Sequence, residues 1–254
     1  MGEEVTRSLK VGITGNTKLT LKCMKAIEKM VDIRYVHGLP DHKLKDKANS
    51  VSLDDYCQEK GVTLNKTNEW SNILFQDLDL VISLGDSRIV PPAVLNKFRV
   101  IGNHGALLPD IQGGASLVWG RMLNTGKWGV SIFELNEKID SGDILVLKPF
   151  EYNTECSMEE FVDLADNKTV EALVDFLQGD ISRASNSKWN IRAAKHVDSK
   201  IGAGILQHAI DNGINIYMPS RTPDDGAIKK EWDDDFVRKF KIANSSPYPN
   251  WRGN

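Results

Sequence analysis

The sequence predicts an α/β protein built on a doubly wound, mostly parallel sheet. Short apolar segments alternate with amphipathic ones over the first hundred residues, which is typical of strands joined by crossover helices. Residues 78–85 (LDLVISLG) are predominantly apolar and predict a buried strand. Beyond Gln178 the chain becomes polar and rich in loop-forming residues. We therefore expect a Rossmann-like core over residues 1–180 and a smaller, loop-rich C-terminal extension over residues 181–254.

Hydrophobic periodicity and turn residues predict the elements of the first half. Residues 9–14 (LKVGIT) are short, apolar and rich in branched side chains, as strands are. Apolar residues recur at three- and four-residue steps over 19–30, which predicts an amphipathic helix. Ser52 begins a Ser-x-x-Asp capping box for a short helix over 53–60. The same reasoning predicts further strands over 33–39, 78–85 and 98–104 and, with prolines at its start, a helix over 91–97.

The second half continues the pattern up to a long helix. The predicted elements are helices over 116–124 and 158–177, strands over 128–135 and 143–148, and weaker helices over 201–212 and 234–240. In a parallel sheet, ligands bind beyond the carboxyl ends of the strands, where the strand order switches. The segments in which to look for a site are therefore 15–18, 85–91 and 103–114.

Composition and charge narrow the range of functions. The 254 residues carry 32 basic and 35 acidic side chains, and the formal net charge of −3 argues against binding to a nucleic-acid backbone. No apolar run approaches the ~18–20 residues of a membrane-spanning helix, and the N-terminus lacks the apolar stretch of a secretory signal. The three cysteines are far apart without Cys-x-x-Cys spacing, which indicates a reducing compartment. We expect a cytoplasmic protein without a bound metal, membrane segment or nucleic-acid partner.

Two motifs carry the candidate chemistry. In GNHGALLPDIQGG (102–114), a histidine ends a predicted strand, and small residues let a ligand approach the backbone. In EKIDSGDIL (137–145), Asp140 lies in a turn just before a strand. A histidine exchanges protons near neutral pH, and an adjacent carboxylate can hold its ring or accept a proton itself. Each motif alone is also compatible with an ordinary polar turn.

Together the motifs resemble the folate-dependent formyltransferases, whose pattern is Asn-x-His, Ser-Leu-Leu-Pro-x-x-x-Gly and a later Asp-x-Gly turn. The positions that match in order are His104, Leu107, Leu108, Pro109, Gly113, Asp140 and Gly142. The chain departs from the pattern because Asn103 directly precedes the histidine and Ala106 replaces the serine. Neighbouring side chains on a regular strand point to opposite faces, so Asn103 can join His104 only if the chain bends, as Gly102 would permit.

The resemblance implies transfer of a formyl group from 10-formyltetrahydrofolate, as co-substrate, to an amine, without a metal. It assigns His104 to proton transfer and oxyanion stabilisation, and Asn103 to oxyanion binding, where one donor is worth ~3–4 kcal/mol. Asp140 would orient His104 and accept the amine proton. The resemblance also implies that the pterin ring of the folate binds against the loop after strand 78–85. The expected cofactor-binding residues are Asp86, Ser87, Arg88, Ile89, Val90 and Gly113.

The C-terminal part resembles the sugar N-formyltransferases and transfer-RNA formyltransferases of this family. Residues 220–232 (SRTPDDGAIKKEW) fit an Arg-x-Pro-Glu-Asp-Gly-x-Ile pattern, and 243–251 (ANSSPYPNW) fit a Pro-Tyr-Pro pattern. We expect a transfer-RNA enzyme to carry a further β-barrel and a basic surface, and a glycinamide ribonucleotide enzyme to carry a Gly-Ser-rich phosphate loop at 15–18. A dTDP-, GDP- or UDP-linked amino-deoxy sugar is therefore the expected acceptor, for O-antigen, lipopolysaccharide or another surface polysaccharide. The candidate substrate-binding residues are Tyr217, Arg221, Trp232, Tyr248 and Trp251.

Alternative interpretations are open from the sequence alone. The acceptor could be methionyl-tRNA or glycinamide ribonucleotide, and the chain could be a folate- or nucleotide-binding homologue without catalytic activity. The displaced Asn103 favours the last of these. Members of the family often dimerise through their C-terminal parts, so the resemblance also suggests a homodimer.

Overall fold

The fold is centred on a seven-stranded sheet of mostly parallel strands. The computed structural model describes residues 8–45, 47–179, 195–196, 216–218, 221 and 223–249. The strand order is β3-β2-β1-β4-β5-β7-β8. The first five strands in this order are parallel, and the β5–β7 and β7–β8 pairs are antiparallel. The predicted α/β class with a mostly parallel, Rossmann-like sheet is confirmed.

The N-terminal half alternates strands and helices as predicted, with three short elements in addition. Its elements are β1 (Lys10–Thr14), α1 (Lys18–Ile27), β2 (Asp32–Gly38), α2 (Asp41–Leu44), α3 (Asp54–Lys60), β3 (Thr63–Lys66), the 3₁₀ helix η1 (Ser71–Phe75), β4 (Leu80–Ser83), α4 (Pro92–Lys97) and β5 (Arg99–His104). β3 was not predicted because it is a short edge strand without a fully buried face.

The capping box predicted at Ser52 is wrong. Helix α3 begins at Asp54, and its N-cap is Leu53, which forms no side-chain cap. The Ser52 hydroxyl instead accepts the Asp54 N–H at 3.1 Å. The helix therefore begins one residue later than the sequence pattern suggests.

The C-terminal half completes the large sheet and adds a small one. Its elements are β6 (Ile111–Gly113), α5 (Ser116–Leu123), β7 (Lys127–Glu134), β8 (Ile144–Glu151), α6 (Met158–Gln178), β9 (Lys195–His196), β10 (Ile216–Met218), the 3₁₀ helix η2 (Pro223–Gly226) and α8 (Asp234–Ala243). Strands β6, β10 and β9 form a second, parallel sheet in that order. The weak helix predicted over 201–212 lies outside the described residues.

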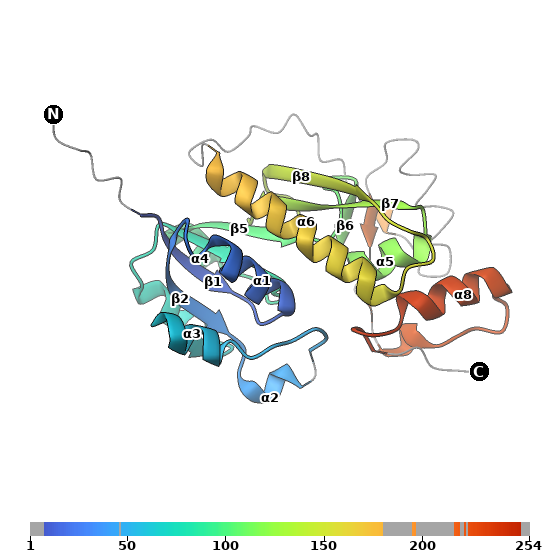
Figure 1. The fold of residues 1–254 in the computed structure, drawn as a ribbon, viewed down its shortest axis with the longest axis horizontal. Coiled ribbons are helices and arrows are strands. Elements are labelled where there is room, and N and C mark those ends of the chain that lie inside the picture. The colour runs from blue at the N-terminus through green and yellow to red at the C-terminus, as the bar shows by residue number, and fades with distance from the viewer. Residues whose placement is uncertain are drawn as a thin grey trace.

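Helices cover both faces of the large sheet. Helices α1 and α6 pack together on one face, and α4 packs on the other (Figure 1). Neighbouring residues of β4 point to opposite faces of the sheet. Ile82 packs in the core with α1 and α6, whereas Val81 packs in the core with α4. None of the helices within the described ranges is both long and apolar enough to span a membrane.

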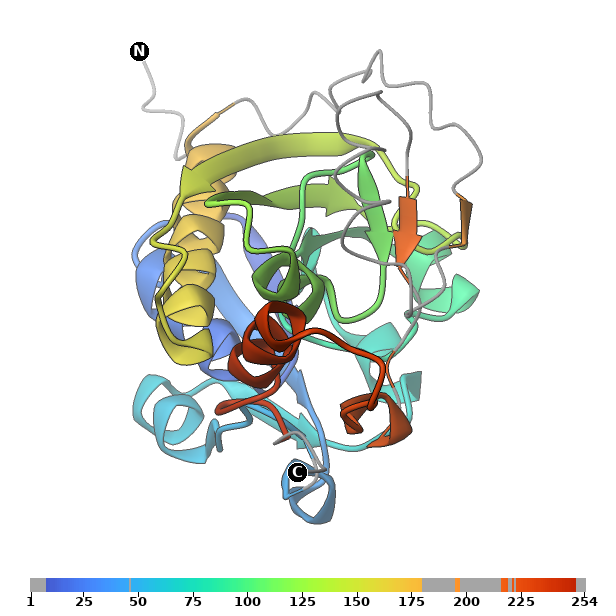
Figure 2. The same cartoon turned by 90° about the vertical axis from the view of Figure 1, so that its right-hand side faces the viewer.

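The described C-terminal elements share a hydrophobic core with α5. Helix α8 packs on α5 (Figure 2), and Met218 and Phe240 lie in one buried cluster with Trp119 and Trp128. The boundary predicted at residue 180 falls just beyond α6, where the described ranges are interrupted. The division into a core and an extension therefore stays a prediction.

Candidate active site

A cavity of about 330 Å³ lies beyond the carboxyl ends of β4 and β5. Its wall combines the loop after β4, the end of β5, the turn before β8 and parts of the small sheet. The predicted site residues that line it are Asp86, Ser87, Arg88, Ile89, Val90, Asn103, His104, Gly113, Asp140 and Tyr217. The fold thus gathers at one edge of the sheet most of the candidates that the sequence spreads over the chain.

The tautomer of the His104 ring is set by a neighbouring carbonyl group. His104 ends β5, and only 7% of its surface is exposed. Its Nε2 lies 2.9 Å from the carbonyl oxygen of Ile111. Because a carbonyl oxygen can only accept, Nε2 must carry a proton and donate it. In the neutral ring Nδ1 then has no proton, and it faces Asp140 Oδ2 at 3.6 Å.

The turn that carries Asp140 is held by β6. Asp140 has a φ of +50°, a left-handed conformation that Asp adopts more readily than most residues. Its Oδ2 accepts the Gly113 N–H at 2.7 Å, and its carbonyl oxygen accepts Gln112 Nε2–H at 2.7 Å. A Cβ on Gly142 would lie 1.7 Å from the Glu134 carbonyl oxygen, so the turn requires glycine there. Sequence reasoning missed these contacts because β6 is only three residues long.

Asn103 lines the same cavity as His104 and Asp140, but its side chain leaves β5 on the face opposite to His104. Strands β5 and β7 keep a regular antiparallel register through Asn103–Ile132 and His104–Ser131, so β5 does not bend between the two residues. Their side chains therefore leave the strand on opposite faces. The Asn103 Oδ1 accepts the Gly85 N–H at 2.9 Å. The bend that Asn103 needs in order to join His104 is not formed.

Gly102 stands where the Asn-x-His pattern has its amide. It lies two residues before His104 and so is on the same face of β5 as His104. A Cβ on Gly102 would come within 2.4 Å of Leu135 Cδ1. The Leu135 side chain therefore occupies the space into which an amide at Gly102 would project.

The loop after β4 presents apolar and charged groups in different directions. The Ile89 side chain is 74% exposed, whereas Val90 is buried. The Asp86 carboxylate is fully buried and forms an ion pair with Arg88 at 2.7 Å. Burial by itself raises the pKa of Asp86, but the hydrogen bonds and charge of Arg88 outweigh it and hold that pKa below its usual value. The carboxylate is thus a charged structural group in the loop.

Of the predicted substrate-binding residues, the structure brings one to the cavity. Tyr217 lies in β10, where its backbone pairs with Gln112 of β6. Arg221 and Trp232 instead line a separate cavity of about 40 Å³ between α5 and α8. Tyr248 is half-buried against the α5 core, and Trp251 lies outside the described residues.

Arg221 is built into that second cluster. Its guanidinium lies over the rings of Trp119 and Phe240, at 5.5 and 5.6 Å from their centres, and donates to the Asp225 carbonyl at 2.6 Å. Burial lowers the pKa of Arg221. Arg221 and Trp232 thus pack the C-terminal elements onto α5, apart from His104.

The acidic, histidine and cysteine side chains do not form a metal centre in the part of the chain that the structure describes. No group of three or more of them gathers there in a metal-binding arrangement.

Comparison with known families identifies the family of this chain. The model of the family described as formyl transferase matches residues 38–177. The chain belongs to the formyl transferase family. The matched span runs from the end of β2 to α6 and includes both motifs, so the resemblance predicted from them is confirmed.

Relatives agree on the family and differ in the substrate that their names give. The methionyl-tRNA formyltransferase of Bacillus cytotoxicus is 26% identical over 200 residues, which are 72% of this chain and 61% of that protein. The chain thus spans about three fifths of the length of this curated relative.

Two solved structures share the fold. A sugar N-formyltransferase from Shewanella sp FDAARGOS_354 has a TM-score of 0.68 at 17% identity, and the match covers 96% of this chain and 91% of that one. HypX from Aquifex aeolicus in complex with tetrahydrofolic acid has a TM-score of 0.60 at 15% identity, covering 95% of this chain and 35% of that one.

Proposed function

We propose that this chain transfers a formyl group from 10-formyltetrahydrofolate to the amine of a nucleotide-linked amino-deoxy sugar. The observation that carries the proposal is the His104–Asp140 pair on the wall of the edge cavity. The two groups come from motifs that match the family pattern, and they meet where ligands bind in doubly wound sheets. Family membership supports formyl transfer as the reaction.

The rim of the cavity suits a flat, partly apolar ligand such as a reduced folate. Among the described residues, the large hydrophobic side chains that stay exposed are Phe75, Ile89 and Ile139. Two of these, Ile89 and Ile139, line the cavity. Exposed apolar groups around a concave site are typical of ligand contacts, because a bound ring removes them from water. The backbone of the loop after β4 can read the polar edge of such a ring.

The site can take up a proton from an attacking amine. A bound 10-formyl folate supplies the formyl group. His104 Nδ1 and the Asp140 carboxylate are two acceptors 3.6 Å apart, and together they can hold one proton. The Ile111 carbonyl keeps the other ring nitrogen protonated, so Nδ1 stays turned toward Asp140. The Gly113 N–H donates to Oδ2 of Asp140 and so fixes the position of that carboxylate.

The N-terminus of α1 supports a sugar acceptor over glycinamide ribonucleotide. Thr17 and Thr20 form a capping box, in which each side chain accepts the backbone N–H of the other residue. The preceding Asn16 accepts the Leu39 N–H through Oδ1. These donors and this side chain are already engaged, so the loop is poorly suited to bind a phosphate monoester. The match to the Shewanella sugar N-formyltransferase, nearly whole in both chains, favours the same choice.

A panel of acceptors tests the proposal. Wild-type protein is incubated with 10-formyltetrahydrofolate and dTDP-, GDP- and UDP-linked amino sugars that differ in the position of the amine. Glycinamide ribonucleotide and methionyl-tRNA serve as comparison acceptors, and His104→Ala as the inactive control. We expect formylation of a nucleotide sugar that His104→Ala abolishes. The names of the sequence relatives give methionyl-tRNA as their acceptor. Formylation of methionyl-tRNA alone would overturn the sugar acceptor and favour that substrate instead.

The remaining expectations follow from this proposal. Folate binding without turnover of any acceptor would support the non-catalytic homologue instead. A cytoplasmic location accords with the free cysteines Cys23, Cys57 and Cys156. Use of the product in O-antigen or another surface polysaccharide, and assembly as a homodimer, stay predictions.

A further inference from the structure

We propose that Arg88 is a positioning residue, which sets the conformation of the folate-binding loop without contacting the folate. The inference rests on the proposed function, because it assigns a role within the same site. It changes the sequence-based expectation for Arg88 from a ligand contact to a support. The loop concerned comprises residues 85–90, between β4 and α4.

The guanidinium of Arg88 has no donor left for a ligand. An arginine carries five N–H donors in a rigid fork. Arg88 Nε donates to the Asp86 carboxylate at 3.0 Å, and Nη2 donates to Asp86 Oδ2 at 2.7 Å. Nη2 also donates to the His37 carbonyl at 2.9 Å, and Nη1 donates to the carbonyls of Thr67 at 2.9 Å and Gly38 at 3.4 Å. All five positions are thus satisfied by the protein itself.

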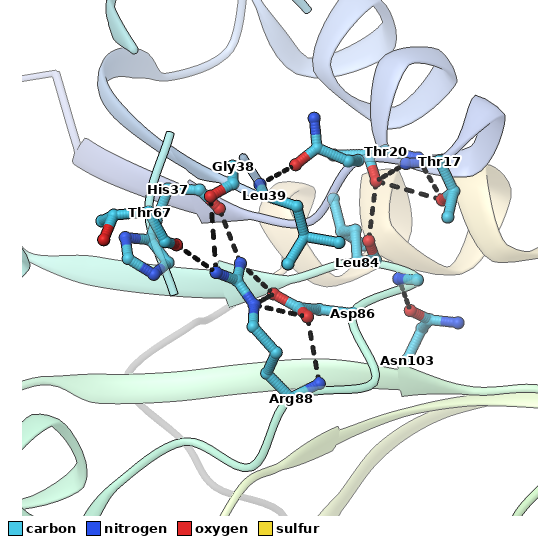
Figure 3. A network of polar contacts seen from close by, with 12 residues as sticks. Thr17, Thr20, His37, Gly38, Leu39, Thr67, Leu84, Asp86, Arg88 and Asn103 are labelled. Atoms are coloured by element: carbon cyan, nitrogen blue, oxygen red, sulfur yellow. Dashed lines mark hydrogen bonds and ion pairs between the residues drawn. The ribbon is translucent and has the colours of Figure 1, made fainter. Parts of the chain in front are cut away.

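These partners tie the loop to two neighbouring strands. His37 and Gly38 end β2, and Thr67 directly follows β3. Arg88 donates to the carbonyl oxygens of all three residues (Figure 3). Two of these oxygens also accept a backbone N–H, because His37 is bound by Gly15 at 3.3 Å and Gly38 by Thr67 at 3.2 Å. The same guanidinium also binds Asp86. The Arg88 side chain therefore connects both Asp86 and Arg88 to the ends of β2 and β3.

Aromatic packing holds the guanidinium in place. The Arg88 Cζ lies 5.1 Å from the centre of the Trp70 ring, and the His37 ring stacks on Trp70 at 4.6 Å. A guanidinium over an aromatic face is attracted to it, and the contact also limits its rotation. A lysine would fill the same space with a point charge, but it could not serve three carbonyls and a carboxylate at once.

The start of the loop is anchored separately. Thr20 Oγ1 donates to the Leu84 carbonyl at 2.7 Å, and Asn103 Oδ1 accepts the Gly85 N–H at 2.9 Å (Figure 3). Directly after these anchored residues, Ile89 is exposed at the cavity and Val90 is buried. Loss of the Arg88 contacts would free the half of the loop that carries these two residues.

Substitutions of Arg88 test the inference through folate binding. Binding of tetrahydrofolate is measured by calorimetry, and the KM values for 10-formyltetrahydrofolate and for the acceptor are measured separately. We expect Arg88→Lys and Arg88→Met to raise Kd and KM for the folate about tenfold or more, with the KM for the acceptor nearly unchanged. Arg238→Lys, an exposed arginine of α8 that pairs with Glu155, is the matched control and should change neither.

The outcomes separate the inference from the proposed function. Wild-type protein that binds no tetrahydrofolate would overturn both. Wild-type binding that Arg88→Lys and Arg88→Met leave unchanged would overturn the inference alone, as would equal losses for folate and acceptor. If the Arg88 variants do not fold, Trp70→Phe removes part of the surface beneath the guanidinium and keeps an apolar ring. It should raise the same folate KM by a smaller factor, and an unchanged KM would contradict the inference.

Discussion

His104 and Asp140 face each other across 3.6 Å through Nδ1 and Oδ2, while the proton of the neutral imidazole lies on the opposite ring nitrogen, at Ile111. Two hydrogen-bond acceptors this close, each fixed by a backbone group, can bind one proton between them. This arrangement differs from one in which the carboxylate simply orients the histidine. The orientation comes from the Ile111 carbonyl, which leaves Asp140 free to share an incoming proton.

Asp140→Asn should lower kcat by about 100-fold or more, the usual scale for loss of a proton acceptor. An amide in place of the carboxylate would donate to Nδ1 and block it. The measurement is the steady-state rate of formyl transfer at saturating substrates. Asp143→Asn, in the same turn, is the matched control and should retain most of the activity. Similar rates for Asp140→Asn and wild type would refute the shared-proton arrangement.

Asn103→Asp should keep kcat within a few-fold of wild type, whereas Asn103→Ala should raise the KM for the folate. Aspartate retains the oxygen that accepts the Gly85 N–H but has no N–H to donate. An oxyanion donor, the role predicted for Asn103 from the resemblance, would instead lose about 100-fold in kcat in both variants. The comparison of kcat between the two substitutions decides between the roles.

His37→Phe should make the protein less sensitive to acid. Burial and the charge of Arg88 lower the pKa of His37 to about 4, and neither ring nitrogen has a hydrogen-bond partner among the described residues. Since this pKa lies below the ordinary value of about 6.5, wild-type stability is complete above pH 6.5 and falls as the pH approaches 4. Between pH 8 and 5 the wild type should lose about 2 kcal/mol more than His37→Phe.

Chemical denaturation at several pH values measures this difference. His42→Phe replaces an exposed histidine of α2 and serves as the control. Equal losses of unfolding free energy for wild type and His37→Phe would contradict a buried, neutral His37.

Asp166→Asn should stabilise the protein at alkaline pH. Asp166 lies on α6 beside a cavity of about 800 Å³, and burial raises its pKa to about 7, although Lys22 opposes the shift. Because the folded pKa is raised, the contribution of Asp166 is present below pH ~4 and is lost as the pH rises through 7. At pH 8 the variant should be more stable by about 4 kcal/mol, with little difference at pH 4.

The control for Asp166 is Asp163, which lies three residues earlier on α6. Lys22 holds the pKa of Asp163 below its usual value, so Asp163→Asn should be neutral or destabilising at pH 8. Denaturation curves at the two pH values measure both variants. A pH-independent effect of Asp166→Asn would mean that the buried group is not protonated.

Local patterns were sufficient to predict most of the fold and to select His104 and Asp140 as candidate site residues. The buried strand at β4 and the long helix α6 follow from the spacing of apolar side chains, a property of neighbouring residues. His104 and Asp140 lie in motifs whose residue types and order identify the family. Strands β6 and β10 were not predicted, because each has three residues and exists through pairing with the other across about a hundred positions of the chain.

The details that govern the site arise from contacts between distant segments. The Ile111 carbonyl that accepts the His104 Nε2–H, and the three carbonyls bound by Arg88, are backbone groups, so no residue type in the sequence marks them. The face on which Asn103 lies depends on the register of β5 against β7. The sequence alone determines the chemistry of each side chain and the periodicity of the apolar residues. The register of the strands, the tautomer of His104 and the contacts that support the loop depend on distant segments, so only the folded chain decides them.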